Sequence, residues 1–381
     1  MKPRAGPGSA MKPRDARALV HRIERAMSDA LSKLEPAPSR PTKLLVAVSG
    51  GADSSATLFA LAERAERHGW QIHAAHVDHG IADSETRASF RAAVRDLTGR
   101  LKIPFTECAV DVPSVAATQR LSVETAARQE RYAALTKVAA QLEVAAIVTG
   151  HTADDQAESV LLHLLRGSGL DGLAGMSSLG AVPIAVPIGA PREDTVRPSL
   201  IRPLLAVRRA QTRALCAHHS LAFADDPANQ DSAFTRNRIR AQVLPALETL
   251  NPNAVGALVQ LAANVRPDRK LLEELTLQAF AKVSLPSHQR EVLLSRAALA
   301  ALPEALRIRV LRMAVLQFAD SPSHDRSQAL LRLARSGGHT IECGGGVQAE
   351  ARGDRLRIWG VAPLPDGGAA YRGPHFPGRG D

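Results

Sequence analysis

The residues best suited to chemistry lie in short polar clusters that each follow an apolar run. The first cluster is Ser49–Ser54, which reads Ser-Gly-Gly-Ala-Asp-Ser. Two glycines let a ligand approach the backbone closely, and a helix starting just after them offers unpaired N–H groups to an anion. We interpret this segment as a phosphate-binding loop. The alternative is an ordinary strand–turn–helix connection in which Ser and Asp only cap the helix.

A second cluster, Gly150–Glu158, follows another apolar run and opens a helix. Asp155 and Glu158 are three residues apart, so they share one helix face. Paired carboxylates there can hold a cation, either Mg²⁺ or an ammonium group. Helix capping by Thr152 or Asp154 is the simpler reading, but it accounts for only one or two of the three acids.

Histidines stand at the ends of two predicted strands, as His76, His79 and His151, with Asp78 between the first two. We expect His76 and His151 to line the nucleotide site. Capping of the strand end is an alternative reading, and metal ligation is the less favoured one.

Arginines form two further groups. Arg128 and Arg131 lie on a predicted helix, where a binding role and a solvated face are equally open. Arg236, Arg238 and Arg240 alternate along the chain rather than following one helix face. We expect this second group to meet RNA phosphate or a triphosphate.

The elements that must position these residues alternate between strands and helices. Apolar runs predict strands at Leu44–Val48, Gln71–Val77, Phe105–Val112 and Val144–Thr149, and helical spacing predicts helices at Asp83–Leu101, Ser122–Leu142 and Ala153–Leu165. This rhythm predicts an α/β fold, with a mostly parallel sheet covered by helices on both faces. Ligands of such sheets bind beyond the carboxyl ends of the strands, where the polar clusters fall.

The amino-acid composition limits which kinds of ligand the chain is expected to bind. The chain has 381 residues, a net charge of +10 and a pI near 10.1, so a polyanion such as RNA is a natural second substrate. Aromatic residues make up only 3%, which argues against broad base-stacking surfaces. The three cysteines form no Cys-x-x-Cys pair, and this disfavours zinc and iron–sulfur sites of the usual spacing. We see no signal peptide or membrane-spanning run, and expect a cytoplasmic protein without membrane partners.

Ser49–Ser54 lacks the Lys-Ser/Thr pair of a Walker A motif and the Gly-x-Gly-x-x-Gly dinucleotide pattern. It resembles the pyrophosphate loop of the N-type ATP pyrophosphatases, which cleave ATP between the α and β phosphates. Within that group, the chain resembles the tRNA(Ile)-lysidine synthetases. The motifs that carry the resemblance occur in order at Ser49–Ser54, His76–Gly80, Ala127–Tyr132, Gly150–Met176, Arg202–Leu205 and Asp225–Pro245.

The resemblance implies an activity. Such enzymes adenylate the C2 oxygen of the wobble cytidine in the tRNA(Ile) with a CAU anticodon, and the side-chain amine of free L-lysine then displaces AMP. ATP would be held by the loop and its neighbours, namely Ser49, Gly50, Gly51, Ala52, Asp53, Ser54, His76 and His151. Asp53 would also hold Mg²⁺. The catalytic residues would be Asp53, Asp155, Glu158 and Arg236. We expect Asp155 and Glu158 to bind and deprotonate the amine. Arg236 would orient the carboxylate of the substrate lysine or stabilise the charge that develops on the phosphate.

The domain organisation follows from the same match. Residues 1–40 are expected to form an N-terminal extension with one amphipathic helix, and residues 41–250 the ATP pyrophosphatase domain. Residues 251–381 are expected to read the tRNA, with a mainly helical part, then a small α+β part, and a disordered tail at 363–381. A Pro-rich insertion near 184–197 departs from the family pattern. No protein partner is predicted.

Three rival functions remain open at this stage. A cytidine thiolase acting on tRNA would need cysteines for sulfur or a cluster. An amidotransferase synthetase would need a nucleophilic cysteine to release ammonia, and none lies near the N-terminus. A non-catalytic RNA-binding relative is disfavoured by the intact Asp53, Asp155 and Glu158, but only turnover excludes it.

Overall fold

The computed structural model describes residues 11–35, 37–39, 41–119, 121–183, 186–187, 198–224, 235–287, 291–319, 321–360 and 369–370, with only the backbone at 186–187 and 369–370. The chain forms two compact units that divide between Arg266 and Pro267. This point lies inside helix α12 (Ala254–Val283). Proline has no N–H to donate, so the units divide where the helix lacks a backbone hydrogen bond.

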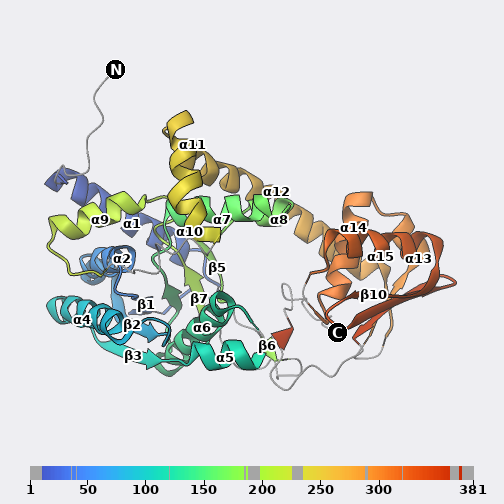
Figure 1. Cartoon of the computed structure of the whole chain (residues 1–381), viewed down its shortest axis with the longest axis horizontal. Helices are drawn as coiled ribbons and strands as arrows, with labels where there is room; N and C mark the ends of the chain where they lie inside the picture. Colours follow the sequence, from blue (N-terminus) through green and yellow to red (C-terminus); the bar gives the residue numbers. More distant parts are fainter. Residues whose placement is uncertain are drawn as a thin grey trace. The chain divides into compact units, whose positions relative to one another are not determined.

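Unit 1 contains the α/β part of the chain (Figure 1). Its strands are β1 (Thr42–Ala47), β2 (Trp70–Asp78), β3 (Phe105–Ala109), β4 (Ala146–Val148), β5 (Leu179–Ala181) and β7 (Ser199–Ile201). Its helices are α1 (Pro13–Leu31), α2 (Ala52–Ala62), α3 (Ala65–His68), α4 (Ser84–Leu101), α5 (Val112–Gln119), α6 (Val123–Leu142), α7 (Ala153–Leu165), α8 (Leu170–Leu173), α9 (Arg209–His218), α10 (Thr235–Arg238), the π-helical turn η2 (Ile239–Val243), α11 (Leu244–Leu250) and the first part of α12.

The sheet of unit 1 has the strand order β3-β2-β1-β4-β7-β5. All neighbouring strands are parallel except β5, which pairs antiparallel with β7. The chain moves outward from β1 through β2 to β3 and then returns to β4 on the other side of β1. The chain direction thus reverses between β1 and β4, and sheets of this kind bind ligands beyond the carboxyl ends of the strands at such a point.

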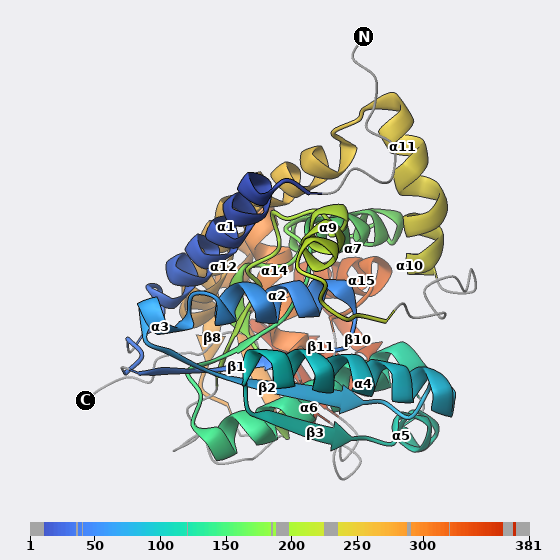
Figure 2. The same ribbon diagram turned by 90° about the vertical axis from the view of Figure 1, so that its left-hand side faces the viewer.

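Alternate residues of the central strands face two separate cores. Leu44 and Val46 pack in the cluster that contains α1, α2 and α9, whereas Leu45 packs against α6 in another cluster. Figure 2 shows α2 and α4 on one side of the strands and α6 on the other. The predicted parallel sheet with helices on both faces is therefore confirmed, and its strands are apolar throughout because both faces are buried.

Helix α1 packs into the main core of unit 1 through Leu19, Ile23 and Met27. The same helix carries Glu24, which is buried and lies 2.7 Å from Nε2 of His68 and 3.4 Å from Nε of Arg64. Residues 1–40 were expected to form an extension, but the apolar face of α1 lies in the same core as the sheet. The first ten residues lie outside the described part of the chain.

The ion pairs of Glu24 should make the contribution of α1 to the unfolding free energy depend on pH. Burial alone would raise the pKa of Glu24, but hydrogen bonds with His68 and His21 and the charges of Arg64 and Arg67 lower it to about 2. A carboxylate with a lowered pKa stabilises the fold fully above its unfolded pKa and loses this effect as the pH falls toward 2. We expect Glu24→Gln to lose about 2 kcal/mol of unfolding free energy at pH 7. Urea unfolding from pH 7 to pH 3 should show this difference shrinking below about pH 4.5; a pH-independent difference would contradict the assignment.

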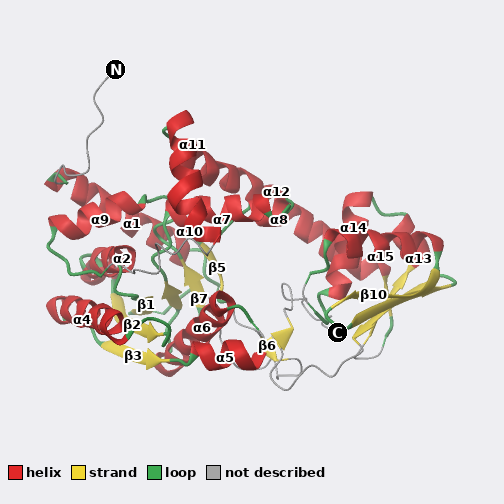
Figure 3. Ribbon diagram, in the orientation of Figure 1, coloured by secondary structure: helices red, strands yellow, loops and turns green. Residues whose placement is uncertain are grey.

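Unit 2 is a small α+β unit. Its elements after α12 are β8 (Ser284–Leu285), β9 (Glu291–Ser295), α13 (Arg296–Ala300), α14 (Glu304–Val315), α15 (His324–Ser336), β10 (Gly338–Gly344), β11 (Val347–Arg352) and β12 (Arg355–Gly360). The strands form an antiparallel sheet in the order β10-β11-β12-β9-β8, with α14 and α15 packed against it (Figure 3). A separate ladder pairs β6 (Val186–Pro187) with β13 (Ala369–Ala370).

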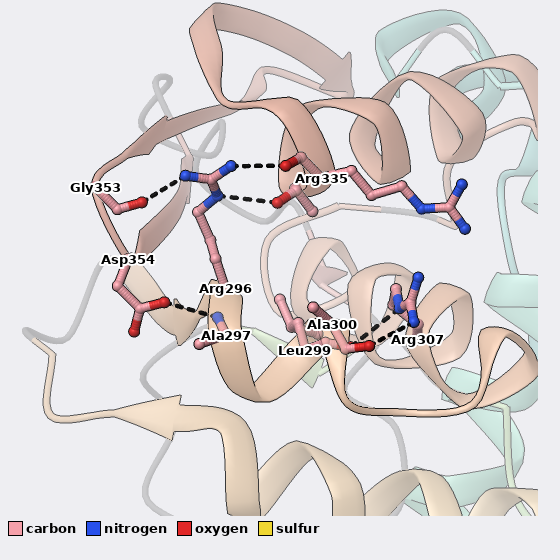
Figure 4. A pocket seen from close by; sticks show the side chains of 9 residues that line it. Arg296, Ala297, Leu299, Ala300, Arg307, Arg335, Gly353 and Asp354 are labelled. Atoms are coloured by element: carbon pink, nitrogen blue, oxygen red, sulfur yellow. Dashed lines mark hydrogen bonds between the residues drawn. The ribbon is translucent and has the colours of Figure 1, made fainter.

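A hollow in unit 2 is lined by arginines that serve the fold (Figure 4). Arg296 donates to the carbonyls of Ala334, Arg335 and Gly353. Arg307 donates to carbonyls at the end of α13. The guanidinium N–H groups of Arg296 and Arg307 are thus hydrogen-bonded to backbone carbonyls. These bonds connect neighbouring elements of unit 2 and leave few donors for a ligand. None of the helices in the described ranges is both long and apolar enough to cross a bilayer.

Candidate active site

The loop after β1 is built as an anion site. Gly51 precedes the first residue of α2, and no side chain caps that helix start. The Ser54 hydroxyl donates to the carbonyl of Gly51 at 2.9 Å, and the N–H of Ser49 donates to the Ser54 oxygen at 3.1 Å. These bonds hold Ser49–Ser54 in one compact turn, with the positive end of α2 directed to the strand edge.

Two glycines bring the polar clusters together. Gly50 has φ +89°, and a Cβ there would lie 2.9 Å from the carbonyl oxygen of Phe90 on α4. Gly150, just after β4, lies so close to α2 that a Cβ would be 3.0 Å from the backbone of Asp53 and Ser54. The end of β4 and the start of α7 are thereby seated directly against the phosphate-binding turn.

The predicted acids do converge at this edge, and one arginine joins them. Nε of Arg209 lies 3.3 Å from Asp53, and its two terminal nitrogens lie 2.7 Å from Asp155 and 3.3 Å from Glu158. Asp53 also accepts a hydrogen bond from the hydroxyl of Thr212. The three carboxylates thus come from α2 and α7 and share one guanidinium from the start of α9.

Glu158 is fully buried and its charge is neutralised by guanidinium groups. Nε of Arg236 donates to one oxygen at 2.9 Å, and Nε of Arg240 donates to the other at 2.7 Å. Asp155 also accepts from the N–H of Thr152 at 2.8 Å, as part of the capping box of α7. Its side chain keeps 13% of its surface exposed, so Asp155 is more accessible than Glu158.

The arginines at Arg236–Arg240 are arranged differently from the expectation. Residues 235–243 are helical, first as α10 and then as the π-helical turn η2. Arg236 and Arg240 are therefore four apart on one helix face, and both reach Glu158, instead of alternating as an extended segment would. A single π-helical turn is a frequent feature of functional sites.

The charges in this cluster shift one another's protonation. Burial raises the pKa of Asp53, although the hydrogen bond from Thr212 and the charge of Arg209 oppose this. Burial alone would lower the pKa of Arg209, but the surrounding carboxylates raise it above its usual value. The guanidinium of Arg209 therefore stays charged.

His76 and His151 lie at the same edge, each beside an oxygen atom of a neighbouring residue. Nδ1 of the buried His76 lies 2.8 Å from the carbonyl of Val48, directly before the loop. Nδ1 of His151 lies 2.9 Å from the hydroxyl of Thr149, and burial together with nearby arginines keeps its pKa well below the usual value. Both histidines therefore brace the strand ends beside the loop.

Asp78 is unsuited to metal binding because arginines hold it. Arg87 contacts both of its oxygens at 2.8–3.0 Å and Arg91 contacts one at 3.2 Å. Burial and the charge of Arg131 lower the pKa of the neighbouring His79 to about 4. Nothing among the described residues forms a group of three or more His, Cys, Asp or Glu side chains arranged to hold a metal ion.

A Mg²⁺ ion fits this site only in company with phosphate. Mg²⁺ is usually held by one or two carboxylates together with substrate phosphates and water. Asp53 meets that requirement, because it stands in the first turn of the helix that follows the loop, with 23% of its side chain exposed.

Among the described residues, four buried polar atoms beside this cluster have no hydrogen-bond partner of their own. They are Nε of Arg131, Nε of Arg202, the Tyr132 hydroxyl and Nδ1 of His79. Arg131 and Arg128 both lie 5.1 Å from the ring centre of Tyr132. Arg131 therefore packs against Tyr132 instead of standing on a fully solvated helix face, and a buried donor without a partner suits an anionic ligand.

Two contributors to the cluster were not predicted, namely Arg209 and Thr212. One signal was present in the sequence: Arg208 and Arg209 open a helix, where cations are unfavourable. The structure offsets this with Asp154, which accepts from the backbone N–H of Arg209 at 2.7 Å and pairs with Arg208 at 3.1 Å. The predicted motif Asp225–Asn229 and Phe234 lie outside the described residues.

The chain is similar to known proteins over most of its length. A family model described as a PP-loop domain matches residues 19–247. The tRNA(Ile)-lysidine synthase of Salinispora tropica is 40% identical over 345 residues, which cover 88% of this chain and 95% of the relative. That of Salinispora arenicola is 37% identical, covering 91% and 97%, and that of Streptomyces coelicolor is 38% identical, covering 85% and 88%.

A solved structure shares the fold. The U34-tRNA thiolase NcsA from Methanococcus maripaludis, solved with its 4Fe-4S cluster, matches with a TM-score of 0.50 at 15% identity, covering 65% of this chain and 80% of that one. Because the family model matches residues 19–247 and the relatives match over 95% and 97% of their length, the chain belongs to the tRNA(Ile)-lysidine synthase family of PP-loop proteins.

Proposed function

We propose that this chain is a carbon–nitrogen ligase that uses ATP to join free L-lysine to C2 of the wobble cytidine in CAU-anticodon tRNA(Ile). The observation that carries the proposal is the placement of Asp155 and Glu158 against the phosphate-binding turn Ser49–Ser54, with Arg209 touching both helices. An activated phosphate and an incoming amine would meet at one point.

The reaction has two steps that balance. The cytosine O2 attacks the α-phosphorus of ATP, forming an O–P bond and releasing pyrophosphate. The side-chain amine of lysine then attacks C2, the C2–O bond breaks, AMP leaves, and the amine gives up its proton. Adenylation is needed because the oxygen on C2 is a poor leaving group until it carries a phosphate.

The turn would hold the pyrophosphate end of ATP through backbone N–H groups and the hydroxyls of Ser49 and Ser54. Ala52 opens the helix that supplies those N–H groups, and His76 and His151 support the strand ends beside them. Asp53 would hold Mg²⁺, which offsets negative charge on the departing pyrophosphate.

The amine of lysine is mostly protonated, since its pKa is about 10.4. A carboxylate must first bind the ammonium and then help to remove a proton. Asp155 is the more exposed acid and would meet the ammonium first. Glu158 would complete the pair once an arginine yields its place, and Arg236 would then be released to steer the negative charge that develops on the phosphate.

The tRNA would be drawn to the cationic groups around Arg128, Arg131 and Arg202. Arg128 and Arg131 face the ring of Tyr132, and among the described residues the Nε atoms of Arg131 and Arg202 have no hydrogen-bond partner. The net charge of +10 favours the same partner.

The experiment that tests the function measures labelled L-lysine incorporated into CAU-anticodon tRNA(Ile) in the presence of ATP, with sulfide and ammonia as comparison nucleophiles. Lysine-specific incorporation supports the proposal, and transfer of sulfur would favour the thiolase alternative. That alternative is disfavoured because Cys216 and Cys343 lie in different units and burial raises the pKa of both thiols, to about 12 and about 11. ATP-independent tRNA binding without turnover would favour the non-catalytic relative.

We predict that unit 2 contributes to tRNA binding more than to nucleotide binding. A truncation at residue 253 would remove Val255, Leu258 and Val259, which pack against α7 in unit 1. The cut is therefore better placed after Arg266. The shortened chain should bind ATP within about threefold of the full chain and bind tRNA at least about tenfold more weakly, as measured by filter binding. Loss of nucleotide binding in a folded truncation would contradict this division.

A further inference from the structure

The acids of the site are paired with arginines of the same chain. Each of four carboxylates contacts at least one guanidinium, and the ion pairs link Asp53, Asp154, Asp155 and Glu158 to Arg208, Arg209, Arg236 and Arg240. An ammonium group can therefore enter only by exchange with an arginine, because adding a cation to a neutral buried cluster is unfavourable.

Arg209 differs from the other arginines of the cluster because it contacts acids on two helices, α2 and α7. Arg236 and Arg240 form ion pairs with acids of α7, whereas Arg209 joins Asp155 and Glu158 on α7 to Asp53 beside the phosphate-binding turn. Its guanidinium is 22% exposed and starts from the first residue of α9. It lies between the place for a triphosphate and the place for an amine.

We propose that Arg209 sets the order of binding, occupying the amine site of the substrate-free enzyme and leaving it when the triphosphate of ATP arrives. The inference rests on the proposed function. Guanidinium groups bind phosphate in a bidentate manner, so the triphosphate offers Arg209 a stronger partner than a shared carboxylate. Asp155 then loses its nearest guanidinium and can accept the lysine ammonium, while Glu158 keeps Arg236 and Arg240.

The consequence is a coupling between two ligands. Lysine should bind weakly to the free enzyme and about tenfold more tightly once nucleotide is present, within the usual range of coupling between sites. Coupling of this kind is reciprocal, so lysine must raise the affinity for nucleotide by the same factor. A purely structural role for Arg209 predicts no such ratio.

The test is calorimetric titration of the full chain with L-lysine, with and without saturating Mg²⁺ and α,β-methylene-ATP, a nucleotide that cannot be cleaved between the α and β phosphates. Arg209→Gln should bind lysine equally in both states, since the internal competitor is gone. Arg208→Gln is the matched control, because the neighbouring Arg208 pairs with Asp154 and Glu248 and not with the amine site. It should keep the tenfold ratio of the unmodified chain.

Arg209→Lys keeps the inference testable if Arg209→Gln does not fold. One ammonium cannot span three carboxylates, so the ratio should fall to about two- or threefold. The inference is overturned if the unmodified chain binds lysine equally with and without nucleotide, or if Arg209→Gln keeps the tenfold ratio. The labelled-lysine assay separates the two ideas: turnover without the ratio removes only the binding order, whereas no lysine incorporation removes the proposed function as well.

Discussion

Lysidine formation at saturating lysine is expected to fall at least about a hundredfold in Glu158→Gln, the range that a positioned acid–base group contributes. Glutamine keeps the shape of Glu158 but removes the charge that neutralises Arg209, Arg236 and Arg240. The Michaelis constant for lysine should rise as well, because the ammonium loses a partner. Steady-state kinetics with varied lysine measures both quantities, and pyrophosphate release without lysine reports whether adenylation survives.

Stability must be separated from chemistry in that experiment. Removing one partner of a buried ion pair costs about 3–5 kcal/mol, so Glu158→Gln should also unfold at a lower temperature. Asp154→Asn is the matched control: it removes the same charge from the same helix, but its partners are Arg208 and the N–H of Arg209. Its turnover should fall by less than about tenfold. If Glu158→Gln retains both turnover and the Michaelis constant for lysine, its assignment to the amine site is wrong.

The second large effect is expected for Gly50→Ala. A left-handed backbone costs a residue with a Cβ about 1–2 kcal/mol, and at Gly50 the added methyl also meets the carbonyl of Phe90 at 2.9 Å. Relieving this clash would move the Ser49–Ser54 turn away from α4, and with it the N–H groups proposed to bind the phosphates. We expect a clear drop in melting temperature and at least about a hundredfold loss of ATP affinity.

Two other glycines provide controls for that result. Gly69 also has a positive φ, at +67°, but a Cβ there would meet nothing within 4 Å, so Gly69→Ala should lower stability slightly and leave ATP binding intact. Gly51 has an ordinary φ of −83°, and a Cβ there would lie 3.6 Å from the hydroxyl oxygen of Ser49, which is a normal contact distance. Gly51→Ala should therefore keep its melting temperature while weakening ATP binding, because its methyl would face the ligand. Normal ATP affinity in Gly50→Ala would show that the turn does not bind phosphate.

Most of the α/β architecture could be read from local pattern. Helix α7 was predicted at its observed bounds, and α4 and α6 begin after the side-chain caps Asp83 and Ser122. The central strands were visible because burial on both faces makes them continuously apolar. The strands β5 and β7 and helix α5 were not predicted, since Leu-Gly-Ala and Ser-Leu-Ile form no continuous apolar run and α5 has a proline at its second position.

The sequence by itself determined the phosphate-binding turn, the α7 acids and the parallel sheet that brings them to one edge, because each depends on neighbours in the chain. Only the tertiary structure decided which charges those acids meet. Arg209, Arg236 and Arg240 are remote from Glu158 in sequence and reach it only after α9 and α10 fold over α7. Long-range ion pairs leave no periodic trace, so the pairing of the acidic cluster with arginines could be seen only in the folded chain.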